Sequence, residues 1–261
     1  MKRRRKTIIA GNLVKVIEST IQLPRDTPQA RRDKREADRE AKKAANVRTA
    51  QGHLEETLAC NFSSLDYFVT LTYRKGEEPK NRREAKKHKA QYIRRLRDAR
   101  ARRGQPLRWI WSIECKHGKG RYHHHAAVNA IGFREDREEL ESLWPFGNVH
   151  IETMFNAGHD QGETMNCWLD IATYMTKERP EGGKDTTPNG WQIYSCSRGL
   201  RKPIVKHEYV EAGTPVEIPA GAIIYRNTED VINQFGYYCY TKYLTAPIVR
   251  NKQSSLAEIE A

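Results

Sequence analysis

The stretch RYHHHAAV, residues 121–128, places three consecutive histidines directly before an apolar run. In a β-strand, successive side chains point to opposite faces of the sheet, so His123 and His125 would share one face and His124 would occupy the other. The apolar residues that follow indicate a strand buried in a sheet, which would hold the imidazoles rigidly. Two imidazoles on one face are a potential pair of metal ligands, although three adjacent histidines are also consistent with a surface cluster.

A second strand is predicted immediately before the histidines, at LRWIWSIE, residues 107–114. The connection at 116–120 contains two glycines and is short, which favours an antiparallel hairpin. Such a hairpin would bring Glu114 next to His123 and His125 on one face of the sheet. Two imidazoles and one carboxylate form a mixed site with open positions, suited to Mn²⁺ or Mg²⁺ that holds a phosphate.

A third strand is predicted at YFVTLTY, residues 67–73, because β-branched and aromatic residues dominate it. Alternation gives this strand one clearly apolar face, while Thr70 and Thr72 lie with Phe68 on the other. The two threonines are common strand formers, and they would also suit the floor of a phosphate-binding site.

A helix is predicted over residues 165–178, and residues 179–183 end it. Asp170, Tyr174 and Lys177 are spaced i, i+4 and i+7, so they share one helical face. A tyrosine is a poor nucleophile at its ordinary pKa of about 10, but a nearby cation or metal stabilises the phenolate. Attack of that phenolate on phosphorus gives a covalent ester. Taken alone, the same pattern also fits a tyrosine at the edge of the core and a surface lysine.

The chain has 261 residues and a formal net charge of +13, which makes a polyanion such as nucleic acid the expected partner. Residues 74–108 contain 15 Lys/Arg against 4 Asp/Glu. Within them a helix over 81–103 is predicted to bury one narrow apolar stripe and to present basic residues, including Arg94 and Arg95, on its other faces. The repulsion between these like charges would be relieved by a nucleic-acid backbone. The candidate DNA-binding residues also include Thr70, Thr72, Arg121 and the basic turn Arg198, Arg201 and Lys202.

The five cysteines are scattered and include no Cys-x-x-Cys pair. This pattern excludes a disulfide framework or a zinc ribbon and indicates a reducing compartment. No run of 18 apolar residues is present, so we expect a soluble cytoplasmic protein without a membrane partner.

The order of the predicted elements is strand, helix, strand, hairpin, helix, strand, which is typical of an α+β fold with one antiparallel sheet. We expect three consecutive parts. Residues 1–60 would be a basic, largely helical arm with a short hairpin around Gly11 and Asn12. Residues 61–210 would form the catalytic domain. Residues 211–261 would be an extension that packs on it, with aromatic residues at 235–244 and a polar tail.

Taken together, the threonine-containing strand, the histidine strand and Tyr174-Met175-Thr176-Lys177 resemble the three motifs of the HUH endonuclease superfamily, in the family's order. The resemblance covers roughly residues 67–202. It is strongest to the single-tyrosine rolling-circle replication initiators of bacterial plasmids and single-stranded DNA phages. His124 departs from the pattern, because a hydrophobic residue usually occupies that position.

This resemblance implies a ferredoxin-like or RRM-like antiparallel sheet with helices on one face. It implies metal binding by His123 and His125, with Glu114 as the third ligand, and catalytic roles for Tyr174 and Lys177. The implied reaction nicks single-stranded DNA at an origin, leaving a 5′-phosphotyrosyl link and a free 3′-OH for a DNA polymerase. Because no Gly-x-x-x-x-Gly-Lys-Ser/Thr segment is present, a host helicase would be required.

Three alternatives remain open at the level of sequence. The chain could be a transposase or relaxase of a mobile element with the same chemistry. It could be a non-catalytic nucleic-acid-binding protein on an RRM-like sheet. Cys115 and His117 could join His123 and His125 in a structural zinc site, which would unfold on chelation. His124 or His117 could also contribute to the catalytic metal site.

Overall fold

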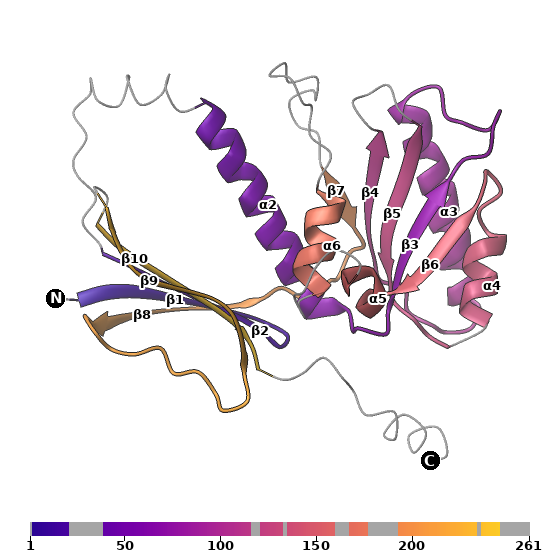
Figure 1. Cartoon of the computed structure of the whole chain (residues 1–261). Helices are drawn as coiled ribbons and strands as arrows, with labels where there is room; N and C mark the ends of the chain where they lie inside the picture. The colour runs from indigo at the N-terminus through magenta and orange to yellow at the C-terminus, as the bar shows by residue number, and fades with distance from the viewer. Residues whose placement is uncertain are drawn as a thin grey trace, which may run out of the picture. The chain divides into compact units, whose positions relative to one another are not determined.

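The computed structural model describes residues 2–20, 39–115, 121–132, 135–159, 167–176, 193–233 and 236–245. The chain divides into two compact units, residues 61–200 and residues 1–60 together with 201–261. Each unit contains a five-stranded antiparallel sheet, accompanied among the described residues by α2 in one unit and by four helices in the other, which confirms the α+β class (Figure 1). Among the described helices, none has the length and apolar content needed to cross a membrane.

The histidine strand lies at the centre of the sheet in the 61–200 unit. The strand order is β6-β3-β5-β4-β7, and every pairing is antiparallel. The predicted antiparallel pairing of the strand at residues 107–114 with the histidine strand is therefore confirmed. The strands are β3 (Tyr67–Thr72), β4 (Trp109–Cys115), β5 (Tyr122–Val128), β6 (Val149–Thr153) and β7 (Tyr194–Cys196).

One face of this sheet is apolar and buried under two helices, α3 (Arg82–Ala101) and α4 (Glu135–Ser142). The core on this face includes Val69, Trp111, Tyr92 and Leu140. The RRM-like arrangement of helices over one face is thus present. A further helix, α6 (Cys167–Met175), lies over the opposite face, where α5 (Met154–His159) precedes it (Figure 1).

Helix α3 begins and packs as its sequence predicts. The Asn81 side chain accepts a hydrogen bond from the Glu84 backbone N–H at 3.0 Å, while the Glu84 carboxylate accepts from the Lys80 N–H at 2.6 Å. These bonds satisfy backbone donors that a helix start would otherwise leave without partners. The buried residues Tyr92, Leu96 and Ala99 recur at steps of three and four, so one stripe faces the sheet, and apart from the buried Arg100 most basic residues face outward.

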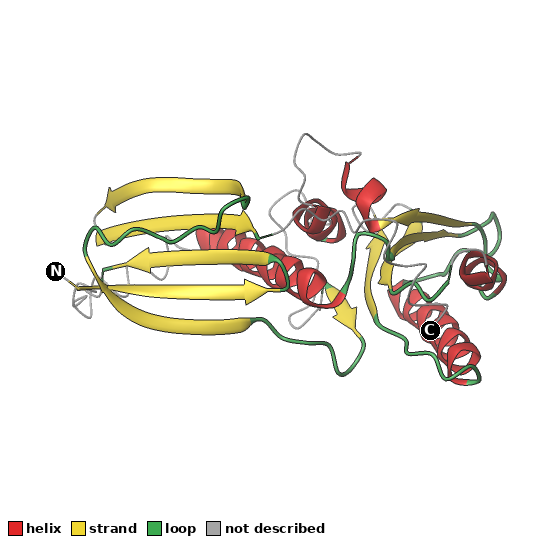
Figure 2. Ribbon diagram, turned by 90° about the horizontal axis from the view of Figure 1, so that it is seen from below, coloured by secondary structure: helices red, strands yellow, loops and turns green. Residues whose placement is uncertain are grey.

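The second unit is built on strands from both ends of the chain. Its sheet has the order β8-β1-β2-β10-β9 (Figure 2), and helix α2 (Arg39–Asn61) belongs to the same unit. The predicted hairpin turn at Gly11 is confirmed, with φ of 59°. A Cβ at this glycine would lie 2.2 Å from the Ala59 carbonyl oxygen of α2, which is too close for a carbon atom. Only glycine therefore fits at this position of the turn. The strands are β1 (Lys2–Ala10), β2 (Leu13–Ser19), β8 (Ile204–Glu211), β9 (Ile223–Asn233) and β10 (Gly236–Leu244).

This arrangement differs from the expected three consecutive parts. The hairpin in the first 19 residues is not part of a separate N-terminal arm, because β1 pairs with β8 and β2 pairs with β10. The described part of α2 begins at Arg39, within the segment predicted to be helical. The grouping differs because β1 pairs with β8, which is almost 200 residues away in the sequence. Local sequence patterns do not indicate which distant strands pair.

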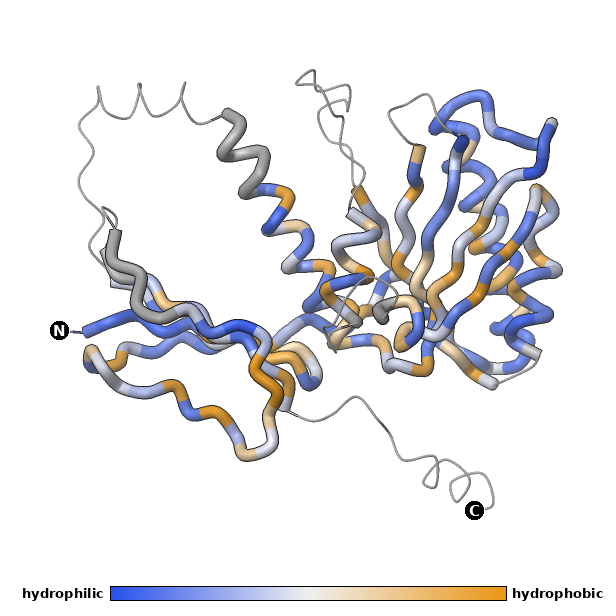
Figure 3. Tube along the Cα trace, in the orientation of Figure 1, coloured by the Kyte–Doolittle hydropathy of each residue, from blue (hydrophilic) through white to orange (hydrophobic). Residues whose placement is uncertain are grey.

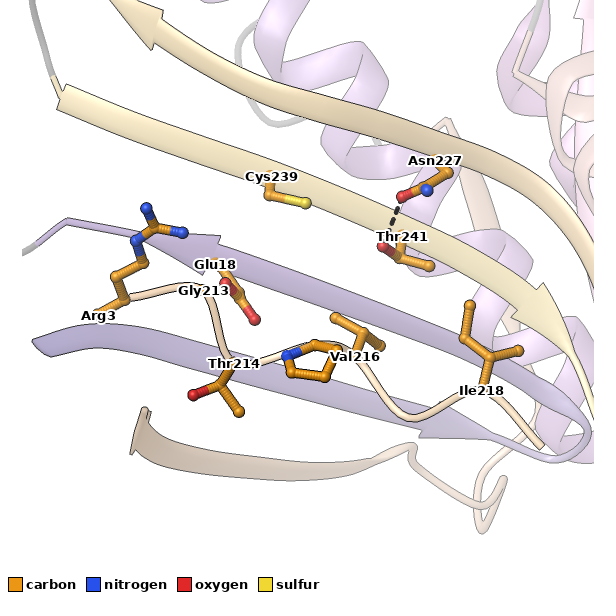
Figure 4. A pocket seen from close by; sticks show the side chains of 10 residues that line it. Arg3, Glu18, Gly213, Thr214, Val216, Ile218, Asn227, Cys239 and Thr241 are labelled. Carbon is orange, nitrogen blue, oxygen red and sulfur yellow. Dashed lines mark hydrogen bonds between the residues drawn. The ribbon is translucent and has the colours of Figure 1, made fainter. Parts of the chain in front are cut away.

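A loop between β8 and β9 covers one face of this second sheet. Val216 and Ile218 pack there against Val14, Val16 and Tyr243. The Arg5 side chain donates to Glu18 at 2.6 Å and to the Thr214 carbonyl oxygen at 2.7 Å, which ties the loop to the strands. Figure 4 shows the residues around a pocket of about 350 Å³ beneath the loop, among them Arg3, Glu18, Asn227 and Thr241.

Candidate functional site

The strand register gathers polar residues on the sheet face opposite α3. His125 is paired with Thr70 on β3 and with Ser112 on β4. His123, one pair further along, is aligned with Thr72 and Glu114. Residues paired across antiparallel strands share a face, so these side chains form two adjacent rows. The predicted sharing of one face by His123, His125 and Glu114 is confirmed at the level of strand register, and Thr70 and Thr72 of β3 lie on the same face.

His125 is the most tightly held member of this group. Only 2% of the residue is exposed, its Nε2 lies 2.8 Å from Glu114 Oε2, and its Nδ1 lies 3.2 Å from Thr70 Oγ1. An ionised Glu114 accepts the Nε2–H, which leaves Nδ1 to accept the hydroxyl proton of Thr70. Because both ring nitrogens have partners, the imidazole is fixed in position and rotation.

Tyr174 reaches the same site from α6. Trp168, Ile171, Ala172 and Met175 are buried and recur at steps of three and four, so they form the face of α6 that packs into the unit. Tyr174 is half-buried beside this stripe. Its ring lies edge-on to the imidazole of His125, with the centroids 4.8 Å apart and an interplanar angle of 87°. The structure therefore brings together the predicted nucleophile and one predicted metal ligand.

Phe68 completes an aromatic group around the tyrosine. Its ring stacks parallel to His125 with centroids 6.0 Å apart, and it meets Tyr174 edge-on at 5.8 Å. Phe68 lies on β3 two residues before Thr70, on the same face of the sheet. Three mutually contacting rings hold the phenol against the histidine strand, so Phe68 is a positioning residue that sequence reasoning placed on this face without a role.

His124 is a core residue and takes no part in this site. It is fully buried on the α3 side, where its Nδ1 accepts from Trp111 Nε1 at 3.0 Å and its Nε2 lies 2.7 Å from the Tyr73 hydroxyl. Burial, together with the positive charge of neighbouring side chains, holds the pKa of His124 well below its ordinary value. Both nitrogens are occupied by core partners, which removes His124 as a metal ligand.

The donor set fits a hard divalent cation in part. Two ligands in adjacent octahedral positions around Mg²⁺ lie about 2.9 Å apart, close to the 2.8 Å between His125 Nε2 and Glu114 Oε2. The Thr70 hydroxyl can donate or accept, so it can stabilise the His125 tautomer that leaves Nε2 free for a metal. Among the described residues, no three His, Cys, Asp or Glu side chains form a complete metal-binding cluster. The preassembled part is therefore the His125–Glu114 pair, with His123 half-buried on the same face.

Two residues near this pair extend the polar face. The buried Ser112 hydroxyl has no hydrogen-bond partner among the described residues, although its register position is next to His125. Tyr194 on β7 is paired with Ser112 and therefore lies on the same face. Sequence reasoning assigned neither residue a role. The sequence does indicate the position of Ser112, because a residue two positions before Glu114 on β4 shares its face.

The predicted DNA-binding residues belong to several elements and to both units. Arg94 and Arg95 are exposed on α3, which covers the face opposite His125. Arg121 directly precedes β5, and its side chain donates to the Tyr73 carbonyl oxygen at 2.6 Å. Arg198 is exposed in the turn after β7. Arg201 and Lys202 are exposed residues of the other unit.

Two of the predicted residues lie outside the described part of the chain, the catalytic candidate Lys177 and the alternative ligand His117. Cys115 bears on the structural zinc alternative. Its side chain is buried on the α3 face of β4, because it follows Glu114, which faces the other way. The strand thus separates Cys115 from His123 and His125, and the four residues of that alternative do not converge on one face.

Comparison with known proteins gives one family. Residues 66–179 match the family model of replication-associated proteins of the ORF2 and gene 2 protein type. The matched segment contains β3, the β4–β5 hairpin and α6, and therefore Glu114, His125 and Tyr174, whereas Tyr194 on β7 lies beyond it. No curated protein and no solved structure matches the chain. The family match supports a Rep-type, replication-associated protein that interacts with DNA.

Proposed function

We propose that the 61–200 unit is a metal-dependent nickase and strand transferase that starts rolling-circle replication. The observation that carries this proposal is the contact between Tyr174 and His125 on the sheet face that also holds Glu114. A tyrosine beside a preassembled imidazole–carboxylate pair is suited to covalent attack on a phosphodiester. The family match of residues 66–179 supports a replication role for the same segment.

In this proposal Tyr174 supplies the nucleophilic oxygen. The new bond joins the phenolic oxygen to phosphorus, and the bond that breaks joins phosphorus to the 3′ oxygen of the preceding nucleotide. The phenol loses its proton and the departing 3′ oxygen gains one. The products are a 5′-phosphotyrosyl link and a free 3′-OH from which a polymerase can extend. Phe68 and His125 hold the phenol ring, so that it is oriented before the DNA arrives.

The metal ligands in this proposal are His125, Glu114 and His123. The first two are preassembled, and His123 would join them by a rotation of its side chain, since it lies on the same face. A bound Mn²⁺ or Mg²⁺ would supply charge at the non-bridging phosphate oxygens. Lys177, one turn beyond the tyrosine in the sequence, would favour the phenolate through its charge.

The test uses the whole protein and a pool of single-stranded oligonucleotides with a randomised core. The protein is incubated with the pool and Mn²⁺, and the readout is a protein–DNA adduct that survives SDS and disappears on nuclease treatment. We expect an adduct with the wild type, and none with Tyr174→Phe or with EDTA. Tyr194→Phe is the matched control, because Tyr194 also lies on this sheet face, and it should retain the adduct. An adduct formed equally by Tyr174→Phe would overturn the assignment of the nucleophile.

A further inference from the structure

The sheet of the 1–60/201–261 unit carries a second set of aromatic and basic residues, in a different unit from Tyr174, His125 and Glu114. Cross-strand pairing arranges them in rows. The first row runs Tyr209, Arg4, Ser19, Tyr238 across strands β8, β1, β2 and β10. The second row runs His207, Lys6, Ile17, Tyr240 across the same four strands. All eight side chains therefore lie on one face of the sheet.

Helix α2 covers only part of this face. In the rows nearest the β1–β2 turn, Ile8, Lys15, Lys242, Leu13 and Leu244 are all at most 7% exposed. Lys15 there contacts Glu55 and Glu56 of α2, at 2.9 Å in each case. The α2 helix runs away from the sheet beyond this point (Figure 1). The covered area ends before the two rows described above.

The uncovered rows expose two large aromatic side chains. Tyr209 is 68% exposed and Tyr238 is 40% exposed, whereas Tyr240 behind them is half-buried. Arg226, from β9, lies over the Tyr240 ring with its guanidinium carbon 5.8 Å from the centroid. Rings held on a sheet and open to solvent on one side can accept the flat face of another ring. Tyrosines that only filled a core would not remain exposed in this way.

The charge of these rows is of one sign. They contain Arg4 and Lys6, and Arg226 follows in the next row, whereas no Asp or Glu occurs in the two rows across β8, β1, β2 and β10. Figure 3 shows that β1 is hydrophilic towards the N terminus and hydrophobic towards the turn. Arg4 Nη2 lies 3.3 Å from His207 Nδ1, which keeps the guanidinium on the sheet surface.

The opposite face of this sheet is different. It carries acidic as well as basic groups, including Glu18 and Glu208 near Arg5, and the loop with Val216 and Ile218 covers much of it. Exposed rings beside rows that hold basic and no acidic side chains thus occur on this face, where Lys2 in the row beyond is paired with Glu211. That combination complements a polyanion with accessible aromatic rings rather than an acidic peptide or a membrane surface.

We propose that this face is a second binding site for single-stranded nucleic acid, separate from the site around Tyr174. Unpaired bases would stack on Tyr209 and Tyr238, and the backbone phosphates would contact Arg4, Lys6 and Arg226. The two exposed tyrosines are three strand spacings apart, or about 14 Å, so one segment must contribute several nucleotides to reach both. A duplex cannot use the rings in this way, because its bases are already stacked.

The test measures binding by the full chain in EDTA, with fluorescent oligo(dT) and oligo(rU) as probes. The double variant Tyr209→Ala/Tyr238→Ala should bind oligo(dT) at least ~10-fold more weakly than the wild type, since each lost stack has a substantial cost. The matched control, Ile204→Ala/Ile224→Ala, removes exposed apolar side chains from the opposite face and should bind within ~2-fold of the wild type. The oligo(rU) arm shows whether RNA uses the same rings.

A second pair of variants tests the charges without altering the rings. Arg4→Gln/Lys6→Gln should reduce the slope of log affinity against log salt by about 1.4, because each phosphate contact on a single strand contributes about 0.7. Lys206→Gln, which lies on the opposite face of β8, should leave the slope unchanged. Unchanged affinity in the tyrosine variant together with an unchanged slope in this variant would overturn the proposal.

Two further readouts separate this site from the nickase. Tyr174→Phe should bind oligo(dT) as the wild type does, and Tyr209→Ala/Tyr238→Ala should still form the covalent adduct when DNA is saturating. Photo-crosslinking with a 4-thiothymidine oligonucleotide should label peptides of β8 or β10. Crosslinks restricted to residues 61–200 would contradict a second site, whether or not the protein forms the covalent adduct.

Discussion

The phenol ring of Tyr174 lies edge-on against the imidazole of His125, with the centroids 4.8 Å apart. Glu114 contacts the same imidazole at 2.8 Å, so a single buried histidine links the proposed nucleophile to the proposed metal-binding carboxylate. Thr70 and Phe68 fix the orientation of that histidine from β3. The part of the site made by Tyr174, His125 and Glu114 is therefore organised before any ligand binds, and such preorganisation favours phosphoryl transfer.

Glu114→Gln should weaken Mn²⁺ binding at least ~10-fold, because the change removes a metal ligand. Removal of a residue that only hydrogen-bonds to a ligand already lowers metal affinity by about 10-fold or more. Isothermal titration calorimetry measures the dissociation constant directly. Glu152→Gln is the matched control, since Glu152 is also paired with a histidine, His150, at 2.7 Å on the same sheet face. Equal effects of the two substitutions would remove Glu114 from the site.

Chelation should abolish cleavage and leave the fold intact. The hydrogen bonds of His125 to Glu114 and Thr70 satisfy the site without a metal, so no uncompensated buried charge remains. Thermal unfolding followed by tryptophan fluorescence should thus be the same with and without EDTA. Unfolding caused by EDTA would instead indicate a structural metal.

His124→Ala should destabilise the 61–200 unit by about 2–5 kcal/mol, because the change leaves a cavity and removes the partners of Trp111 and Tyr73. All five tryptophans of the chain lie between residues 109 and 191. Tryptophan fluorescence therefore follows the unfolding of this unit. The folded protein should keep its affinity for Mn²⁺, and a loss of that affinity at a temperature where the variant is folded would show that His124 belongs to the metal site.

Glu55→Gln should destabilise the other unit by about 3–5 kcal/mol, because the change removes the carboxylate that the buried Lys15 and Lys242 share and leaves Glu56 as the carboxylate partner of Lys15. Circular dichroism should record this loss, whereas tryptophan fluorescence should not. Glu208→Gln is the control, as Glu208 is exposed on β8.

The same carboxylate makes the stability of this unit pH-dependent. Burial alone would raise the pKa of Glu55, but Lys242 and Lys15 outweigh it and hold the pKa below the ordinary value of 4.5. The unfolded chain therefore binds the proton more readily, and the stabilisation is complete above pH 4.5 and is lost as the pH falls through the lowered pKa. Glu55→Gln should flatten this acid limb of the stability curve. An unchanged acid limb would show that other groups control it.

Local sequence patterns predicted the parts of the site that depend on strand alternation and hairpin connectivity. The shared face of His123, His125 and Glu114 follows from a period of two and a short glycine-containing turn. The position of Tyr174 beside this face followed from the family resemblance. Its contact with Phe68 could not be predicted, because it depends on how α6 packs across the sheet.

The packing of elements that are far apart in the sequence could not be predicted, for a physical reason. The basic character of α3 is compatible with either face of the sheet, and only the apolar face formed by Val69, Trp111 and their neighbours decides which side the helix covers. Strand β8 was missed because charged residues interrupt its apolar alternation. It is an edge strand with most residues exposed, so neither of its faces needs to be apolar.

The central claim is that Tyr174 forms the covalent link to DNA, and mass spectrometry of the purified adduct tests it most directly. After nuclease and protease digestion, the peptide that contains Tyr174 should carry a nucleotide phosphate on its tyrosine, in the presence of Mn²⁺ only. The same modification on Tyr194 or on any other residue, with the Tyr174 peptide unmodified, would contradict this account of the site.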